Sequence, residues 1–284
     1  MKIVSLIFTR NEGELLHENI EFHIKQGVDL FLIMDSASND DTVKVMQKFE
    51  KQGIARCFYD NKIFKQKEQI DRLARIAFRE NKPDWLILSD TDEFWFYPKG
   101  LKAYFSCVPK EINTLKIKRY QYFPTEKDNS RKQLVHRRML FRENGQGIGF
   151  DTGLGHYEEG IARSKIAFRP VHRDIDIMPG NHTVHFPGRR VLKVPKKECI
   201  IREYPFRDYR QFEDKVKRAE VIFRKNQLYK GNKKLGTHWH AFLQTLRQGK
   251  LEKFYKNSIF FDKYHLQKAL TARVLVRDET LAKW

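Results

Sequence analysis

Residues 1–92 alternate between apolar runs and amphipathic stretches. The apolar runs, each the length of a single strand, are residues 3–8, 30–34, 54–59 and 85–89. Between them, apolar positions recur at helical spacing near residues 13–26, 40–52 and 67–80. Strands joined by helical crossovers are typical of a doubly wound, mostly parallel sheet flanked by helices. The pattern therefore predicts an α/β fold of this kind.

The pattern becomes looser beyond residue 100. Short strand-like runs occur among Gly, Pro and His at residues 112–118, 133–141 and 164–169. Glycines crowd residues 145–160, which indicates a loop over a site. Helical spacing of apolar residues returns at 206–223, with Arg and Lys between them, and residues 231–284 look helical and basic. We therefore expect a helical C-terminal extension.

Polar clusters follow three of the predicted strands. They are Thr9 to Glu12, Asp35 to Asp41 and Asp90 to Glu93. In open parallel sheets, ligands bind beyond the carboxyl ends of the strands, where the strand order reverses. The three clusters should therefore meet in one cleft.

The third cluster contains two carboxylates, Asp90 and Asp92, at positions i and i+2. Alternate residues of a strand point the same way, so both side chains can face one point in space. A hard divalent cation, Mn²⁺ or Mg²⁺, prefers such oxygen ligands and often takes its remaining ligands from substrate phosphates. A solvated acidic turn is the alternative, but the two neighbouring polar clusters favour a site for a phosphorylated ligand.

Net charge and cysteine content bear on the binding partners and on the cellular compartment of the protein. The chain carries 55 Lys and Arg against 36 Asp and Glu, a net charge of +19, which predicts attraction to polyanions without saying which kind. Its three cysteines lie far apart, which favours a reducing compartment over a disulfide framework. The sequence shows no signal peptide and no apolar run long enough to span a bilayer. We expect a cytoplasmic protein that is soluble or peripheral to the inner face of the membrane.

Three motifs together resemble glycosyltransferase family 2, the inverting, sugar-nucleotide-dependent enzymes of the GT-A fold. They are Thr9-Arg10-Asn11-Glu12, the stretch from Asp35 to Thr42, and the stretch from Asp84 to Phe94 with its Asp-X-Asp motif. "DWLILSDTDEFW" and "EYPFRDYRQFEDKV" are similar to a branch found in polysaccharide and lipopolysaccharide gene sets. The resemblance implies a GT-A-like fold, a nucleoside-diphosphate sugar as donor, and a glycan or lipid-linked acceptor.

The resemblance also implies roles for individual residues. Asp35 would lie against the nucleotide base, and Asp90 and Asp92 would hold Mn²⁺ or Mg²⁺ on the diphosphate. The predicted donor-binding residues are Thr9, Arg10, Asn11, Glu12, Asp35, Ser38, Lys67, Arg72, Asp90 and Thr91. The family often adds a late histidine to the metal. His182 in a Gly-Asn-His turn is the best match, followed by His185 and then by His156, His238 and His240.

Inversion requires a general base that takes the proton of the acceptor hydroxyl. The sequence has no clean copy of the acidic pair that the family uses. Asp151, Glu158 and Glu159 are the nearest candidates, because they lie in the glycine-rich region. We assign residues 1–100 to donor binding, 101–200 to acceptor binding within the same GT-A domain, and 201–284 to a basic helical region that offers a contact with anionic membranes.

Two other functions compete with this interpretation. A metal-dependent phosphotransferase or phosphatase of the haloacid dehalogenase type also carries Asp-X-Asp after a strand, but it places that strand near the amino terminus and a small hydroxyl residue where this chain has Phe94. A non-enzymatic nucleic-acid-binding protein would suit the charge of +19, but no nucleic-acid-binding motif appears. Nucleic acid is therefore disfavoured as a partner.

Overall fold

The computed structural model describes residues 1–61, 66–128, 133–145, 164–193, 199–225 and 237–284. The chain divides into two compact units that are not successive in sequence. The first unit contains Met1–Arg119 and Arg163–Glu203, and the second contains Tyr120–Ala162 and Tyr204–Trp284. The predicted division of roles among residues 1–100, 101–200 and 201–284 stays a prediction.

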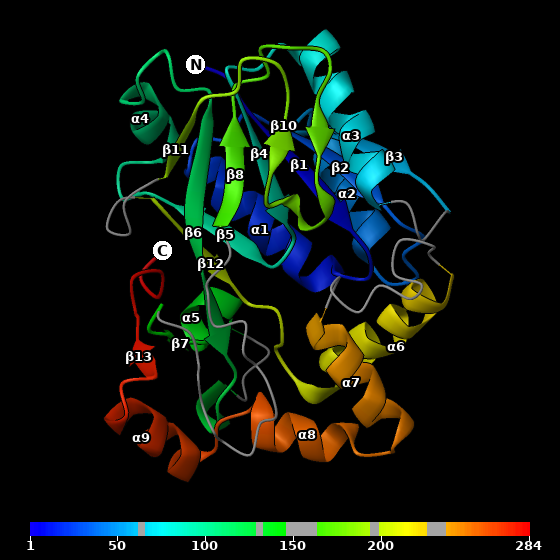
Figure 1. The fold of residues 1–284 in the computed structure, drawn as a ribbon, viewed down its shortest axis with the longest axis vertical. Coiled ribbons are helices and arrows are strands. Elements are labelled where there is room, and N and C mark those ends of the chain that lie inside the picture. The colour runs from blue at the N-terminus through cyan, green and yellow to red at the C-terminus, as the bar shows by residue number, and fades with distance from the viewer. Residues whose placement is uncertain (62–65, 129–132, 146–163, 194–198, 226–236) are drawn as a thin grey trace. The chain divides into compact units, whose positions relative to one another are not determined.

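The first unit is built around the predicted parallel sheet (Figure 1). Its first strands are β1 (Ile3–Thr9), β2 (Leu30–Asp35), β3 (Ala55–Tyr59) and β4 (Trp85–Asp90). All four run parallel in the order β4-β1-β2-β3, with Thr9 level with Asp35 and Phe8 level with Asp90. The carboxyl ends of these strands therefore form one edge, and the α/β prediction is confirmed.

Later strands extend this sheet with mixed direction. They are β5 (Glu93–Phe96), β6 (Thr114–Phe123), β8 (Ser164–Phe168), β11 (Val191–Lys193) and β12 (Ile200–Glu203). Strand β8 lies antiparallel between β4 and β6, and β12 runs antiparallel to β5. A separate pair, β9 (Asp176–Ile177) and β10 (Val184–His185), flanks the short helix η3 (Pro179–Asn181). These insertions bring residues from 164–203 to the sheet.

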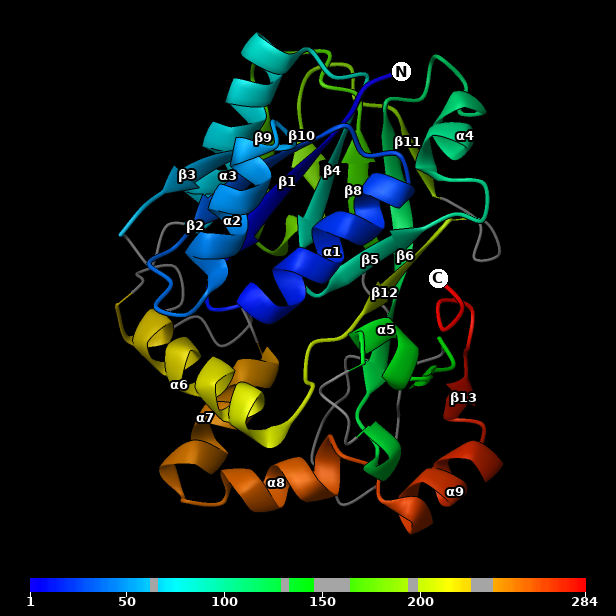
Figure 2. The same ribbon diagram turned by 180° about the vertical axis from the view of Figure 1, so that it is seen from behind.

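Helices cover both faces of this sheet (Figure 2). They are α1 (Gly13–Lys25), α2 (Thr42–Lys51), α3 (Gln66–Ile76), the π-helix η1 (Ala77–Asn81) and α4 (Leu101–Ser106). Helices α1, α2 and α4 bury their apolar stripes in one cluster with alternate strand residues such as Ile7 and Ile33. Helix α3 packs in a second cluster with the other set, such as Leu6 and Met34. Period-2 alternation thus sends each strand's side chains to two separate cores.

The second unit is mainly helical. Its elements are η2 (Glu126–Asp128), α5 (Val135–Arg138), β7 (Phe141–Glu143), α6 (Tyr209–Lys225), α7 (Thr237–Arg247), α8 (Leu251–Ser258), α9 (Lys263–Thr271) and β13 (Leu275–Arg277). Strand β7 pairs with the end of β6 and with β13. Aromatic and aliphatic side chains of α6, α7 and α8 form one core around Phe212 and Phe242. The predicted helical C-terminal extension is confirmed.

Two details bear on the predictions from sequence. The run at 133–141 was expected to be a strand, but it forms α5, and a strand begins only at Phe141. Short apolar runs do not distinguish a strand from a helical turn, which explains the error. Among the described residues, no helix combines the length and the apolar composition needed to cross a bilayer.

Candidate active site at the carboxyl edge of the sheet

The loops after β1 and β2 are bonded to each other. The backbone N–H of Asn11 donates to Ser38 Oγ at 2.8 Å, and the Asn11 side chain exchanges hydrogen bonds with Asn39 at 2.7 and 2.8 Å. Asn11 and Ala37 have positive φ angles of 51° and 56°, which non-glycine residues adopt only where their surroundings hold them. The first two polar clusters therefore meet, as the sequence predicted.

The same contact continues into the starts of α1 and α2. Glu12 N–H donates to Thr42 Oγ1 at 2.9 Å, and Gly13 N–H donates to Asp40 Oδ2 at 3.1 Å. A Cβ atom on Gly13 would lie only 2.6 Å from the Thr42 backbone nitrogen, so no larger residue fits without moving the chain. The two helix N-termini are thus fixed at the carboxyl edge.

Asp35, at the end of β2, is buried but only half bonded. It is 3% exposed, and its Oδ2 atom accepts the backbone N–H of Ser38 at 3.1 Å. Its Oδ1 atom is buried and has no hydrogen-bond partner within the described part of the chain. Buried acceptors are normally satisfied, so this oxygen is placed to receive a hydrogen bond from a ligand.

Residues Asp90–Glu93, here called the carboxylate turn, connect β4 to β5 beside these loops. Thr91 Oγ1 lies 3.1 Å from Thr9 Oγ1, which joins the carboxylate turn to the end of β1. Asp92 is 8% exposed, and Glu93 is fully buried. All three predicted clusters therefore lie at one edge of the sheet.

Two buried cations neutralise the carboxylate turn. Lys165, on β8 and 1% exposed, forms ion pairs with Asp90 and with Glu93, the latter at 3.1 Å. Arg119 bridges Glu93 at 3.2 Å and Glu203 at 2.8 Å. Glu93 also accepts the backbone N–H of Asp90 at 3.0 Å. A buried charge is tolerated only when it is paired, and each of these charges has a partner.

Burial shifts the proton affinities in this network. It raises the pKa of Glu93 to about 8, against the opposing effect of Lys165, and raises the pKa of Glu203 to about 7, against Arg119. Burial disfavours the Lys165 ammonium, but Asp90 and Glu93 outweigh it and raise its pKa above the ordinary value. Lys165 therefore stays charged.

Two side chains of helix α1 hydrogen-bond to the backbone of the carboxylate turn and of the strand that follows it. Asn19 Nδ2 donates to the backbone oxygens of Thr91 at 2.9 Å and Glu93 at 2.8 Å. His23 Nε2 accepts the backbone N–H of Trp95 at 3.1 Å, so its Nδ1 carries the proton and donates to Asn19 O at 2.9 Å. Complete burial lowers the pKa of His23 to about 4, which keeps the ring neutral. The backbone on both sides of Asp92 is therefore held by two buried side chains.

The Gly-Asn-His turn reaches the same carboxylates from another side. Gly180 and Asn181 have φ angles of 81° and 61°, and the Asn181 amide donates to Asp90 Oδ1 at 3.3 Å. The Nδ1 atom of His182 lies 2.9 Å from the carbonyl oxygen of Ser164 and donates to it. That bond leaves the lone pair of the ring on Nε2, the arrangement usual in metal-binding histidines. Asn181 and Lys165, the respective neighbours of His182 and Ser164, both contact Asp90.

The fit of a metal ion to these residues is partial. No group of three or more His, Cys, Asp or Glu side chains in the described ranges is arranged to hold an ion. Asp90 already receives Lys165 on one oxygen and Asn181 on the other. Mg²⁺ sites that bind nucleotides commonly use one or two carboxylates and complete their shell with phosphate oxygens and water. The carboxylate turn fits such an open site, but not a closed protein cage.

Other predicted residues have structural partners or lie elsewhere. Lys67 pairs with Asp71 at 2.8 Å and also with Asp176, and the Arg72 guanidinium lies 5.9 Å from the Phe58 ring centre. His185 is exposed on β10, and His240 lies on α7 in the second unit. Asp151, His156, Glu158, Glu159 and the His238 side chain lie outside the described residues. The roles predicted for all of these residues stay predictions.

Sequence reasoning missed several residues of this site, namely Asn19, Arg119, Lys165, Asn181 and Glu203. Some of them left a signal. Lys165 lies directly before the apolar residues 166–168, and Asn19 and His23 place polar groups at i and i+4 on the buried side of α1. A polar residue at a core position indicates a buried partner, but the sequence alone does not say which partner.

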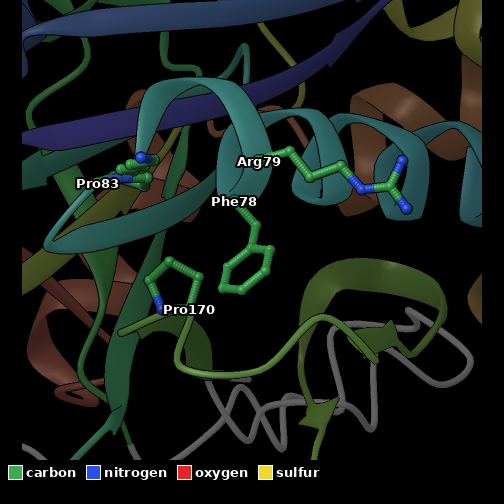
Figure 3. Close-up of a pocket in the computed structure, with 5 residues that line it drawn as sticks. Phe78, Arg79, Pro83 and Pro170 are labelled. Carbon is green, nitrogen blue, oxygen red and sulfur yellow. The ribbon is translucent and has the colours of Figure 1, made fainter.

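A surface hollow lies away from these residues. Phe78, Arg79, Lys82, Pro83 and Pro170 line it, and Figure 3 shows Phe78 and Pro170 facing each other across it. It borders η1 and the segment that enters β4, so it belongs to the amino edge of the sheet. None of the predicted site residues lines this hollow.

Comparison with known proteins identifies the class of enzyme. The profile of glycosyltransferase family 92 matches residues 4–254. TarS from S. aureus, residues 1–349 in complex with UDP-GlcNAc, is 11% identical over 90% of this chain and 81% of its own, with a TM-score of 0.45. Glucosyl-3-phosphoglycerate synthase from Mycobacterium tuberculosis, with Mn²⁺, UDP and glucosyl-3-phosphoglycerate, is 19% identical over 42% of this chain and 44% of its own, with a TM-score of 0.30.

No curated protein matches this chain in sequence. The matched family is 92, whereas the three motifs resemble family 2, so the predicted class of enzyme is confirmed but the family number is not. The phosphotransferase and nucleic-acid-binding alternatives are set aside by this match. Because the profile spans most of the chain, the protein belongs to glycosyltransferase family 92.

Proposed function

We propose that this glycosyltransferase moves a sugar from a nucleoside-diphosphate sugar to a glycan or lipid-linked acceptor, with inversion at the anomeric carbon and with a divalent cation. The observation that carries the proposal is the meeting of three polar loops at one edge of the sheet. The carboxylate turn contacts Thr9 through Thr91, and the loop of Thr9 is bonded to the loop of Asp35. Ligands of open α/β sheets bind at this edge.

The donor diphosphate would lie against the carboxylate turn. Asp92 and Asp90 would hold Mn²⁺ or Mg²⁺, and His182 is the predicted further ligand, with its Nδ1 donating to Ser164. A bound cation would stabilise the negative charge that develops on the leaving nucleoside diphosphate. Lys165 and Arg119 keep the carboxylates of the carboxylate turn fixed and partly neutralised, which lowers the repulsion that a diphosphate would otherwise meet.

The acceptor hydroxyl needs a base on the face opposite the leaving group. Asp151, Glu158 and Glu159 remain the proposed candidates for this role. Each of them would have to lie within hydrogen-bond reach of the acceptor oxygen, directly or through one water molecule. Conversion of each to its amide is the direct comparison, since the base variant should lose turnover while it still binds the donor nucleotide.

The net positive charge of the chain supports a proposal for the class of acceptor and for the cellular location. A net charge of +19 suits an anionic or lipid-linked glycan, as in the synthesis of cell-surface polysaccharide or lipopolysaccharide. We propose that the protein works in the cytoplasm at the inner face of the membrane, with the basic residues of α6 as its contact with anionic lipid. Flotation with vesicles of neutral or anionic lipid tests this contact, because binding should require the anionic lipid and weaken with salt.

Calorimetric titration of UDP, GDP, CMP and dTDP into the purified protein tests the donor class. Each nucleotide is titrated with and without Mn²⁺, into the wild type and into Asp92→Asn. We expect metal-dependent binding of one nucleotide in the wild type and a loss of that binding in the variant. Asp214→Asn, the same change at an exposed carboxylate on α6, is the matched control and should bind the nucleotide like the wild type. Absence of binding by every nucleotide under both conditions would contradict the proposal.

The stereochemistry is tested separately. NMR of the product formed in the first minutes of reaction reports the anomeric configuration before it equilibrates. Inversion predicts a product configuration opposite to that of the donor sugar. A product that retains the donor configuration would overturn the assignment of mechanism, but not the assignment of donor.

A further inference from the structure

Helix α3 buries two polar side chains, Gln69 and Asp71, beside its apolar ones. Gln69 is 4% exposed and is followed on the same face by Ile70, Leu73 and Ala74, which pack in the core against Met34. Both polar atoms of its side chain, Oε1 and Nε2, are buried without a hydrogen-bond partner in the part of the chain that the structure describes. Gln69 is the one uncharged side chain in that part with two such atoms.

The neighbours of Gln69 on the same helix are fully engaged. Asp71 accepts from Lys67 at 2.8 Å and from the backbone N–H of Ile177 at 2.8 Å, and Lys67 also pairs with Asp176. Lys67 and Asp71 are therefore bonded, whereas the buried side chain of Gln69 has no partner among the described residues. A buried amide with neither end satisfied opposes folding, so a residue of this type needs another explanation.

The position of Gln69 in the fold offers that explanation. Strand β3 ends at the carboxyl edge, where Asp60 N–H donates to the carbonyl oxygen of Asp35 at 3.0 Å. Helix α3 begins at Gln66, packs against β1 and β2, and leads through η1 to the start of β4 at the opposite edge. Gln69, in the first turn, thus belongs to the end of α3 nearest Asp35. Asp35 Oδ1 and Ser36 Oγ are also buried without partners among the described residues.

We propose that Gln69 is a donor-binding residue whose side-chain amide hydrogen-bonds the base of the donor nucleotide. This inference rests on the proposed function. The amide N–H of Gln69 donates to a carbonyl oxygen of the base, and Asp35 Oδ1, which can only accept, takes a ring N–H beside that carbonyl. Uracil, thymine and guanine present that pair of groups. Cytosine and adenine present an unprotonated ring nitrogen, which a carboxylate oxygen repels.

The test compares Gln69→Leu with the wild type by calorimetry and by thermal unfolding. Leucine keeps the volume of the side chain and removes the unsatisfied amide. We expect the affinity for the nucleoside diphosphate that binds the wild type to fall by about 10- to 100-fold, because the base loses its hydrogen bonds in a buried site. Pyrophosphate, which has no base, should bind both proteins equally. The ligand-free variant should unfold at a higher temperature than the wild type.

Gln26→Leu is the matched control. Gln26 is also fully buried, but its Oε1 atom accepts the backbone N–H of Tyr97 at 3.0 Å, and it follows α1 at the amino edge. This control should unfold at a lower temperature and bind nucleotide like the wild type. A purely structural role for Gln69 predicts the same behaviour for Gln69→Leu, which would overturn the inference.

Three outcomes separate the two proposals. If the wild type binds UDP, dTDP or GDP and Gln69→Leu binds it equally well, the inference about Gln69 is wrong and the proposed function stands. A wild type that prefers CDP or ADP would likewise contradict the inference alone. If the wild type binds no nucleoside diphosphate with or without Mn²⁺, the proposed function itself fails.

Discussion

The carboxylate turn and the end of β2 belong to the same edge of one sheet, but they are bonded in opposite ways. Asp90 is held by Lys165 and by the side-chain amide of Asn181. Glu93 is held by Lys165, Arg119 and the backbone N–H of Asp90. At the end of β2, Asp35 keeps a buried oxygen without a partner among the described residues. Folding alone thus completes the bonds of Asp90 and Glu93, whereas a ligand would complete those of Asp35. The groups that hold Asp90 and Glu93 should therefore govern stability, and Asp35 should govern recognition of the ligand.

Among the variants that test this difference, Lys165→Met should lower the free energy of unfolding the most. It leaves Asp90 and Glu93 without their buried cation, and removal of one partner of a buried pair costs about 3–5 kcal/mol. Urea unfolding of the variant measures this loss. Lys193→Met, at an exposed strand position, is the control and should change stability by less than about 0.5 kcal/mol. A loss as small as the control's would mean that the carboxylate turn does not depend on Lys165.

Asn19→Leu should have the next largest effect. It removes the donor to two buried carbonyl oxygens, those of Thr91 and Glu93, and should lower the free energy of unfolding by about 2–3 kcal/mol. Asn39→Leu removes one hydrogen bond, from Asn11 Nδ2 to Asn39 Oδ1, at an exposed position and should cost less than about 1 kcal/mol. Equal losses for the two variants in urea unfolding would show that burial of the carboxylate turn is not what makes Asn19 important.

The smallest effect is a pH dependence from His23. Its pKa is about 4 in the folded protein against 6.5 for an ordinary histidine, so the unfolded state binds the extra proton between these values. The stabilisation from the neutral ring is complete above pH 6.5 and is lost as the pH falls toward 4, by about 2 kcal/mol at pH 5. Urea unfolding at pH 7 and pH 5 measures this loss.

His23→Gln is the comparison for that measurement, because glutamine does not titrate in this range. The variant should show a smaller loss of stability between pH 7 and pH 5 than the wild type. An identical loss in both proteins would mean that other groups cause the pH dependence.

The sequence predicted the fold of the first unit well, because its strands appear as short apolar runs and its helices as apolar residues at helical spacing. Apart from Ser5 and Ser89, residues at 3–8, 30–34 and 85–89 are apolar on both faces, as expected for strands covered on both sides. Because each polar cluster directly follows one of these strands, the sequence also predicted that the clusters would lie together. The run at 133–141 failed because it is too short for its period to decide between helix and strand.

The site was predicted only in part, for a physical reason. Thr9, Asp35 and Asp90 lie directly at the ends of strands, so local sequence places them. Lys165 and Arg119 act through ion pairs to residues far away in the chain, and the sequence gives no register for the antiparallel strands that carry them. Long-range pairing of this kind depends on tertiary packing, which a single sequence does not reveal.

The most direct test of the account is the rate of nucleoside-diphosphate release from the donor sugar by Asp92→Asn, measured together with its urea unfolding. Because the carboxylate turn is proposed to stabilise charge on the leaving group, the rate should fall by about 100-fold or more. The free energy of unfolding should stay within about 1 kcal/mol of the wild-type value. A chelator should suppress the wild-type rate to a similar extent. A folded variant that retains the wild-type rate would contradict the assignment of the active site.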